Sequence, residues 1–267
     1  MSISMQTKVV LLTGGARGIG AAMAAAFAAA GAKVMLSDVL KDAGRATAEA
    51  IRSAGGEADF VEHDVRDEPA WEAAIAATIS RFGTLTTLVN NAGIEVSAPI
   101  AELPIADLDR LMEVNVRGLA LGMKHAMRTM RPTGAAGKGG VILNLSSLAQ
   151  LRANPGTGAY AATKAAVDRL TKIGAVEGGK FGWNIRVNCL YPGLIQTEML
   201  AGLLQQQIKM GFFQNEEQMQ AYSIDRTPLG RLGTVEDIAN AALFLCSDLA
   251  SFVTGVGLSV DGGMALT

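Results

Sequence analysis

A chain of 267 residues, 49% of them hydrophobic, is long enough to bury a substantial core. Its formal net charge of -2, with lysines and arginines scattered along the chain, gives no electrostatic reason to bind nucleic acid or an anionic membrane. The two cysteines have no CxxC or Cys/His companion, which excludes a disulfide framework, and we expect no metal site.

The N-terminal segment Met1–Lys8 is too short and too polar for a signal peptide. No apolar run along the chain reaches the length of a membrane span. We therefore expect a cytoplasmic protein without a membrane partner.

Short apolar runs alternate along the chain with longer alanine-rich stretches. Strands as apolar as these are covered on both faces, as in a parallel sheet flanked by helices. The alternation predicts an α/β Rossmann fold, a doubly wound parallel sheet with helices on both faces, in a single domain over 1–267. A segment at about 195–225 breaks the rhythm and is interpreted as an excursion from the sheet. The predicted strands lie at 9–12, 33–36, 59–62, 85–89, 141–145, 185–190 and 258–260.

A glycine-rich turn at 13–20 (TGGARGIG) joins the first predicted strand to the first predicted helix. Glycines here let the backbone turn tightly and approach a pyrophosphate, whose charge then lies at the helix N-terminus. A glycine cluster alone also suits an ordinary tight turn, but the strand–turn–helix context favours a dinucleotide. We expect the cofactor to be bound here by Gly14, Arg17, Gly18, Ile19 and Gly20.

Asp38 ends the second predicted strand, where a carboxylate can bind the ribose hydroxyls of NAD and repel the 2′-phosphate of NADP. The alternative is a helix N-cap ahead of Asp42. Arg17 complicates the choice, because an arginine in this turn could contact a 2′-phosphate. No basic residue directly follows Asp38, so we predict NAD as the cofactor and NADP as the weaker candidate.

The ends of two further strands are expected beside the same cofactor, since ligands of open α/β sheets lie at the carboxyl ends of the strands. The third strand leads into Asp64 and Val65, which we expect on the adenine side, Asp64 at the adenine amino group. The fourth leads into 90–93 (NNAG), where Asn91 would reach the adenosine ribose. A loop cap is the alternative for both polar side chains. Glu95, just beyond, could touch a polar substrate or only solvent.

Tyr160 and Lys164 are four residues apart, which places a phenol and an ammonium group on one helix face. A free tyrosine has a pKa of about 10, and a lysine charge within about 4–6 Å lowers it. We expect Tyr160 to be the proton-transfer residue, although a lone YxxxK is common on helix surfaces. Ser146 and Ser147 end the fifth predicted strand, and a hydroxyl there could polarise a substrate oxygen. The chemistry does not choose between them.

Asn115 lies inside a predicted helix, where an amide side chain has poor intrinsic propensity. It is either a buried residue that bends the helix or the group that holds a water linking Lys164 to solvent.

In order and spacing, these segments resemble the short-chain dehydrogenase/reductase family over nearly the full chain. The resemblance rests on 13–20, Asp38, 90–93, Asn115, Ser147, 160–164 (YAATK), 192–193 and 259–263 (SVDGG). It implies an NAD-dependent oxidoreductase that interconverts a secondary alcohol and a ketone. It also implies a catalytic tetrad of Asn115, Ser147, Tyr160 and Lys164.

The resemblance prefers Ser147 over Ser146, because the spacing from Ser147 to Tyr160 is the usual one in the family. Tyr160 and Lys164 would also contact the cofactor, Lys164 at the nicotinamide ribose. The backbone of Ile195 and the hydroxyl of Thr197 would hold the carboxamide. The family resemblance further implies a homotetramer, with 260–263 similar to segments that members use in assembly.

The 195–225 segment is rich in apolar side chains and methionines. It could be a lid over an apolar alicyclic, aryl or steroid-like alcohol, or it could pack against the body or a neighbouring subunit. The loop 149–154 is expected to form another pocket wall.

Two rival functions remain at this point. An NADPH-dependent reductase of 3-oxoacyl thioesters keeps the fold but is disfavoured by Asp38. A catalytically silent nucleotide sensor is disfavoured because the tetrad is complete.

Overall fold

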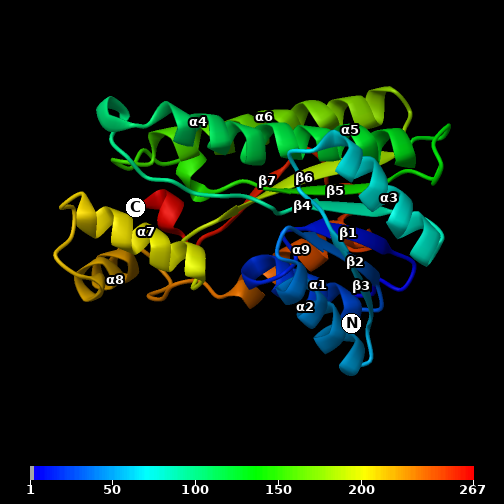
Figure 1. Ribbon diagram of the computed structural model, residues 1–267, viewed down its shortest axis with the longest axis horizontal. Helices are drawn as coiled ribbons and strands as arrows, with labels where there is room; N and C mark the ends of the chain where they lie inside the picture. The colour runs from blue at the N-terminus through cyan, green and yellow to red at the C-terminus, as the bar shows by residue number, and fades with distance from the viewer. Residues whose placement is uncertain (1–2) are drawn as a thin grey trace.

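The computed structural model describes residues 3–267, so Met1 and Ser2 of the N-terminal segment lie outside it. Its centre is a seven-stranded, entirely parallel sheet of strand order β3-β2-β1-β4-β5-β6-β7 (Figure 1). The winding direction reverses between β1 and β4, which places a crevice at the carboxyl ends of these strands. The strands are β1 Val9–Thr13, β2 Lys33–Asp38, β3 Glu57–Glu62, β4 Thr87–Asn90, β5 Gly140–Leu145, β6 Ile185–Pro192 and β7 Gly257–Val260.

Helices cover both faces of the sheet (Figure 1), which confirms the predicted doubly wound α/β fold. On one face lie α1 Gly18–Ala29, α2 Lys41–Ser53 and α9 Val235–Cys246, and on the other lie α3 Glu68–Phe82, α4 Ile105–Leu111, α5 Leu119–Met130 and α6 Gly158–Lys180.

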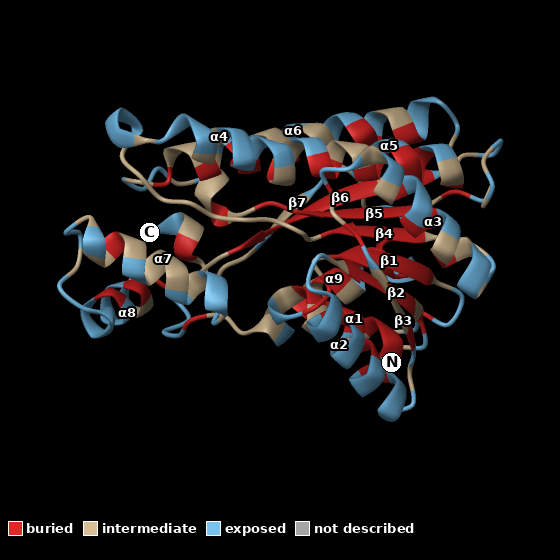
Figure 2. Ribbon diagram, viewed as in Figure 1, coloured by how far each residue is buried: buried red, intermediate tan, exposed pale blue. Residues whose placement is uncertain are grey.

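Strand β1 shows why its residues form a central strand. Val10 and Leu12 belong to the hydrophobic core on the α1 face, and Leu11 belongs to the core on the α5 face. All three are fully buried, as Figure 2 shows for the central strands. A strand packed on both sides needs a continuous apolar run, which is the pattern that the sequence carries.

Two segments depart from this regular layering. Between α4 and α5, the chain forms a π-helical turn, Met112–Gly118. After β6, helices α7 Glu198–Lys209 and α8 Glu216–Asp225 stand away from the sheet, near the C-terminal end of the chain (Figure 1). Among the helices of residues 3–267, none combines the length and apolarity needed to cross a bilayer.

Candidate active site

The glycine-rich turn after β1 is closely packed and needs glycine at particular positions. Gly14 and Gly18 have φ angles of +66° and +56°. A Cβ on Gly20 would lie 2.0 Å from the carbonyl oxygen of Gly14. Helix α1 begins at Gly18, and its N-cap Arg17 makes no side-chain capping bond. The turn therefore brings a tight backbone surface and uncapped N–H groups together, an arrangement suited to a pyrophosphate.

Asp38, at the end of β2, is tied to this turn. Its carboxylate accepts hydrogen bonds from the backbone N–H of Ala16 at 3.1 Å and of Leu40 at 3.0 Å. The N-cap of α2 is Leu40, so the alternative in which Asp38 caps that helix is wrong. Arg17 forms an exposed ion pair with Glu198 of α7.

The side chains after β3 and β4 are engaged within the protein. The Asp64 carboxylate pairs with the Arg66 guanidinium at 2.7 Å and accepts from the Arg66 backbone N–H at 3.0 Å. The carbonyl of Val65 accepts from the Trp71 indole at 2.9 Å. Both residues therefore stabilise this loop.

The Asn91 amide clamps the glycine-rich turn to the end of β4. Its Nδ2 donates to the carbonyl oxygens of Thr13 at 3.0 Å and Gly14 at 2.9 Å. This clamp leaves no space for a side chain at Gly14, where a Cβ would lie 2.8 Å from Asn91 Nδ2.

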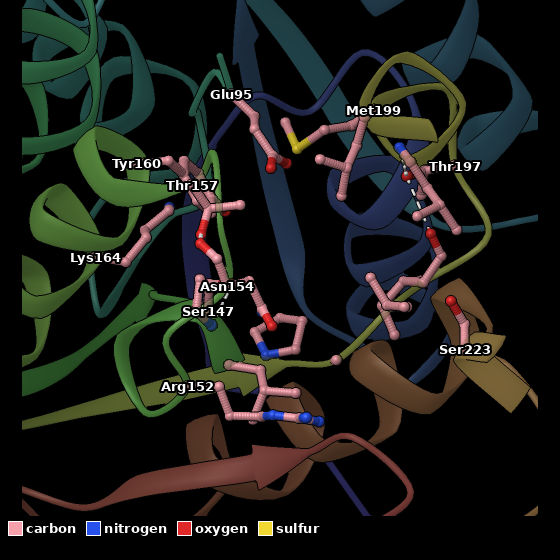
Figure 3. A pocket seen from close by; sticks show the side chains of 18 of the residues that line it. Glu95, Ser147, Arg152, Asn154, Thr157, Tyr160, Lys164, Thr197, Met199 and Ser223 are labelled. Atoms are coloured by element: carbon pink, nitrogen blue, oxygen red, sulfur yellow. Dashed lines mark hydrogen bonds between the residues drawn. The ribbon is translucent and has the colours of Figure 1, made fainter. Parts of the chain in front are cut away.

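Helix α6 and the end of β5 bring Ser147, Tyr160 and Lys164 to one cavity wall (Figure 3). Ser146 is buried, and its hydroxyl donates to the Lys164 carbonyl at 2.8 Å. Ser147 lines the cavity on the same wall as Tyr160, and its hydroxyl accepts from the Ala149 N–H at 3.1 Å. The geometry thus separates the two serines: Ser146 anchors α6, and Ser147 faces the space where a substrate would lie.

Lys164 is buried beneath Tyr160. Its Nζ lies 5.6 Å from the centroid of the Tyr160 ring and donates to the Leu145 carbonyl at 2.9 Å. Burial lowers the pKa of Lys164 to about 8, against an opposing influence from Glu95.

Tyr160 differs from the sequence-based expectation. Burial, reinforced by the nearby Glu95 carboxylate, raises its pKa, and the nearby Ser147 hydroxyl only partly opposes this. For the protein's own groups, the net shift is therefore opposite to the expected lowering, because burial penalises the phenolate form.

Asn115 lies in the π-helical turn, fully buried. Its side chain accepts from the Ile94 N–H at 2.9 Å and donates to the Ile94 carbonyl at 2.9 Å and to Thr163 of α6 at 3.2 Å. At the neighbouring Gly93, a Cβ would lie 3.3 Å from Asn115 Oδ1 and 3.5 Å from Lys164 Nζ. Asn115 therefore braces the segment that passes beside Lys164.

Beyond β6, the chain passes the cavity at Ile195 and Thr197. Ile195 forms a parallel bridge with Gly233. The Thr197 hydroxyl donates to the Ile195 carbonyl at 3.2 Å and, as the N-cap of α7, accepts from the Leu200 N–H at 3.3 Å. Thr197 thus fixes the start of the 195–225 excursion at the edge of the cavity.

These elements enclose a cavity of about 470 Å³. Its predicted members are Ile19, Asn91, Ser147, Tyr160, Lys164, Ile195 and Thr197, while Gly14, Arg17, Gly18, Gly20, Asp38, Asp64, Val65 and Asn115 lie outside its lining. Helices α7 and α8 and their connection contribute Met199, Leu200, Leu203, Phe212, Phe213, Met219 and Tyr222.

The loop 149–154 lines the cavity as predicted, and the guanidinium of Arg152 in this loop donates to the Met264 carbonyl at 2.9 Å. Sequence reasoning missed lining residues from more distant segments. Met264, near the C-terminus, and Arg226, at the end of α8, carried no sequence signal for this role. In the described range 3–267, no group of three or more His, Cys, Asp or Glu side chains could hold a metal ion.

Comparisons with known proteins all find similarity to oxidoreductases. A family model described as enoyl-(acyl carrier protein) reductase matches residues 14–265. The trans-4-hydroxycyclohexanecarboxylate dehydrogenase of Sinomonas cyclohexanicum is 41% identical over 96% of this chain and 92% of its own. The 2,5-dichloro-2,5-cyclohexadiene-1,4-diol dehydrogenase of Sphingobium indicum is 39% identical over 100% of this chain and 99% of its own.

A solved structure extends the similarity to three dimensions. The 7α-hydroxysteroid dehydrogenase complexed with NADH and 7-oxo glycochenodeoxycholic acid superposes with a TM-score of 0.88 at 36% identity, covering 97% of this chain and 95% of the other.

Proposed function

The chain belongs to the short-chain dehydrogenase/reductase family and is an oxidoreductase that acts on alcohol groups; from this premise, we propose that it uses NAD to interconvert an apolar alicyclic, aryl or steroid-like secondary alcohol and its ketone. The observation that carries the proposal is the convergence of Ser147, Tyr160 and Lys164 on one mostly apolar cavity beside the glycine-rich turn. The names of the relatives, two cyclohexane-type alcohol dehydrogenases and a hydroxysteroid dehydrogenase, support the substrate class.

The residues of the crevice fit a dinucleotide. The tight glycine-rich turn, in which a Cβ at Gly20 would collide with the Gly14 carbonyl, and the uncapped start of α1 suit the pyrophosphate. Asp38 would bind the adenosine ribose hydroxyls and repel a 2′-phosphate, while Arg17 is paired with Glu198. These contacts favour NAD over NADP.

Other cofactor contacts follow from the same arrangement. We assign the adenosine side to Asp64, Val65 and Asn91, which hold the loops around it. On the nicotinamide side, the Ile195 backbone and the Thr197 hydroxyl would hold the carboxamide, and Lys164 the ribose. Gly14, Gly18 and Ile19 complete the turn around the pyrophosphate.

Proton transfer is the task of the side chains at the cavity wall. Bound NAD supplies the hydride acceptor and a positive ring charge that opposes the raised pKa of Tyr160. During oxidation, the Tyr160 phenolate oxygen takes the proton of the substrate hydroxyl as the carbinol C–H bond breaks and the C=O bond forms. Ser147 donates a hydrogen bond to that oxygen. Lys164 stabilises the phenolate, and Asn115 supports proton exit past Gly93.

The segment 195–225 acts as a lid in this proposal. Both of its helices and their connection direct apolar and sulfur-containing side chains into the cavity. A mobile, apolar cover would exclude water and accommodate alicyclic rings of different shape. We further propose that the enzyme is a cytoplasmic homotetramer.

The test is an NADH-absorbance assay with purified protein, NAD or NADP, and secondary alcohols of alicyclic, aryl and steroid type. We expect turnover with NAD on at least one group. Turnover that requires NADPH and a 3-oxoacyl or enoyl thioester would contradict the proposal and support a biosynthetic reductase. Binding of NADH without turnover of any alcohol, ketone or thioester would support a nucleotide sensor.

A further inference from the structure

Glu95 is an acidic side chain directed into an otherwise mostly apolar cavity. It follows the NNAG turn at the end of β4, and Figure 3 shows its carboxyl group pointing into the cavity between Tyr160 and Met199. A carboxylate among apolar side chains costs free energy unless it has a partner. Its position beside the reacting groups indicates that this partner comes with the substrate.

Within residues 3–267, no protein group donates a hydrogen bond to the Glu95 carboxyl. The positive charge that lowers its pKa is that of Lys164. Burial outweighs that charge and raises the pKa of Glu95 to about 7. The Glu95 charge also acts on Tyr160 and Lys164, so the carboxyl lies close to where the alcohol must react. Once ionised, above about pH 7, the carboxylate is therefore a strong acceptor without a protein donor.

The geometry points to Glu95 as the acceptor for a second hydroxyl group of the substrate, so that the enzyme favours alicyclic diols over mono-alcohols and over hydroxy acids. This inference rests on the proposed function and specifies its substrate class. A hydroxyl on the same ring as the reacting carbinol would donate to the carboxylate, a charge-assisted hydrogen bond inside a cavity. A substrate carboxylate at that position would be repelled by the Glu95 charge. It would also lose its hydration without gaining a hydrogen-bond donor from the protein.

The two sequence relatives described above illustrate both kinds of substrate. One is named for a cyclohexadiene diol and the other for a hydroxycyclohexanecarboxylate. In this chain, Arg152 and Arg226 also line the cavity, but Arg152 is bound to the Met264 carbonyl, and Arg226 lies over the Tyr222 ring at 5.0 Å. Near Tyr160, the acidic side chain that lines the cavity is Glu95.

The experiment compares kcat/KM with NAD for the cyclohexane-1,2-, 1,3- and 1,4-diols, cyclohexanol and 4-hydroxycyclohexanecarboxylate. It uses the wild type, Glu95→Gln and Glu95→Asp. Glu102→Gln is the matched control, because Glu102 is exposed outside the cavity. In Glu95→Gln, we expect the ratio of the best diol to cyclohexanol to fall about 10- to 100-fold, mainly through KM of the diol.

The same variant should raise the ratio of the hydroxy acid to cyclohexanol about tenfold, because the repelling charge is gone. Glu95→Asp should keep the discrimination against the hydroxy acid and lose preference for the best diol. Glu102→Gln should leave every ratio as in the wild type. In Glu95→Gln, a fall of the diol ratio together with a rise of the hydroxy-acid ratio distinguishes a binding role from general loss of activity.

A second measurement needs no variant. In the wild type, the ratio of diol to cyclohexanol should rise with pH through about 7 as Glu95 ionises. Using the ratio cancels effects that act on both substrates alike, including titration of Tyr160 and Lys164 on α6. The positive charges of Arg152 and Arg226 at the other cavity walls do not titrate in this range.

Equal changes for all substrates in Glu95→Gln, or a diol ratio that is flat with pH, would overturn the inference while leaving the dehydrogenase function intact. Absence of turnover with every alcohol in the wild type would overturn the proposed function as well, and so distinguishes the two failures.

Discussion

At the end of β2, the Asp38 carboxylate holds the glycine-rich turn, and in the proposed cofactor site it would also contact the adenosine ribose. In Asp38→Ala, we expect KM for NAD to rise about 10- to 100-fold and the preference for NAD over NADP to shrink, since the charge that repels a 2′-phosphate is removed. Asp42→Ala, on the exposed first turn of α2, is the control. The check is kcat/KM for both cofactors, and an unchanged preference would remove Asp38 from cofactor selection.

Glu95 should also reduce stability at alkaline pH. Its pKa in the folded protein is about 7, above the ordinary value of 4.5, so the folded state binds more protons between these pH values. Its stabilising contribution is complete below pH 4.5 and is lost as pH rises through 7. Glu95→Gln should therefore be more stable than the wild type at pH 8, by up to about 3 kcal/mol, and not at pH 4.5.

This stability difference is measured by thermal unfolding at the two pH values and at fixed protein and cofactor concentrations. Glu102→Gln serves again as the control. A Glu95→Gln variant that gains nothing at pH 8 would show that the carboxyl is not desolvated in the folded protein.

At the residue scale, the sequence predicted the shared position of Tyr160 and Lys164 correctly but not the electrostatics of Tyr160. The spacing of Tyr160 and Lys164 indicates that they share a helix face, because that depends on helix geometry alone. The direction of the Tyr160 pKa shift was wrong because it depends on burial and on Glu95, which lies 65 positions earlier in the chain. Such surroundings are defined only by the tertiary fold.

At the scale of elements, strands were predicted well where both faces are apolar, as in β1 and β5. The π-helical turn Met112–Gly118 was not predicted, although Asn115 within it was singled out. The side chain of Asn115 bonds to Ile94 and Thr163, 21 positions earlier and 48 later. No local pattern contains those partners, so helical periodicity could not reveal the wider turn.

Helices α7 and α8 provide a test of the lid. Phe212, in their connection, lines the cavity but is 43% exposed, so truncating it should cost little stability. In Phe212→Ala, we expect kcat/KM to fall about tenfold for bulky alicyclic or steroid alcohols and less for cyclopentanol. Phe181→Ala, at the far end of α6, is the control. Lower thermal stability with unchanged substrate preference would instead favour a purely packing role.

At the scale of the whole molecule, the alternation of strands and helices was enough to predict the doubly wound sheet, because short right-handed crossovers leave few topologies. The sequence could not predict that Met264 reaches the cavity. That contact depends on how the last strand, the C-terminal turn and Arg152 pack together. Long-range packing of this kind has no periodic signal.

Exposed apolar side chains on α6 support the proposed assembly. Ile173 and Val176 are 49% and 59% exposed on one face of this helix. We expect the mass of a tetramer from light scattering, and a smaller species when Val176→Asp places a charge in the contact. A wild-type monomer at micromolar concentration would contradict the tetramer, and an unchanged mass in the variant would exclude this face.

The most direct measurement of the central claim follows the hydride. An alicyclic alcohol of the panel, with deuterium on its carbinol carbon, is incubated with NAD and the enzyme, and the nucleotide is analysed by mass spectrometry. We expect one deuterium in the NADH, and none formed by Tyr160→Phe, which should still bind NAD. NADH without deuterium, or near-normal turnover by Tyr160→Phe, would contradict hydride transfer with Tyr160 as the proton acceptor.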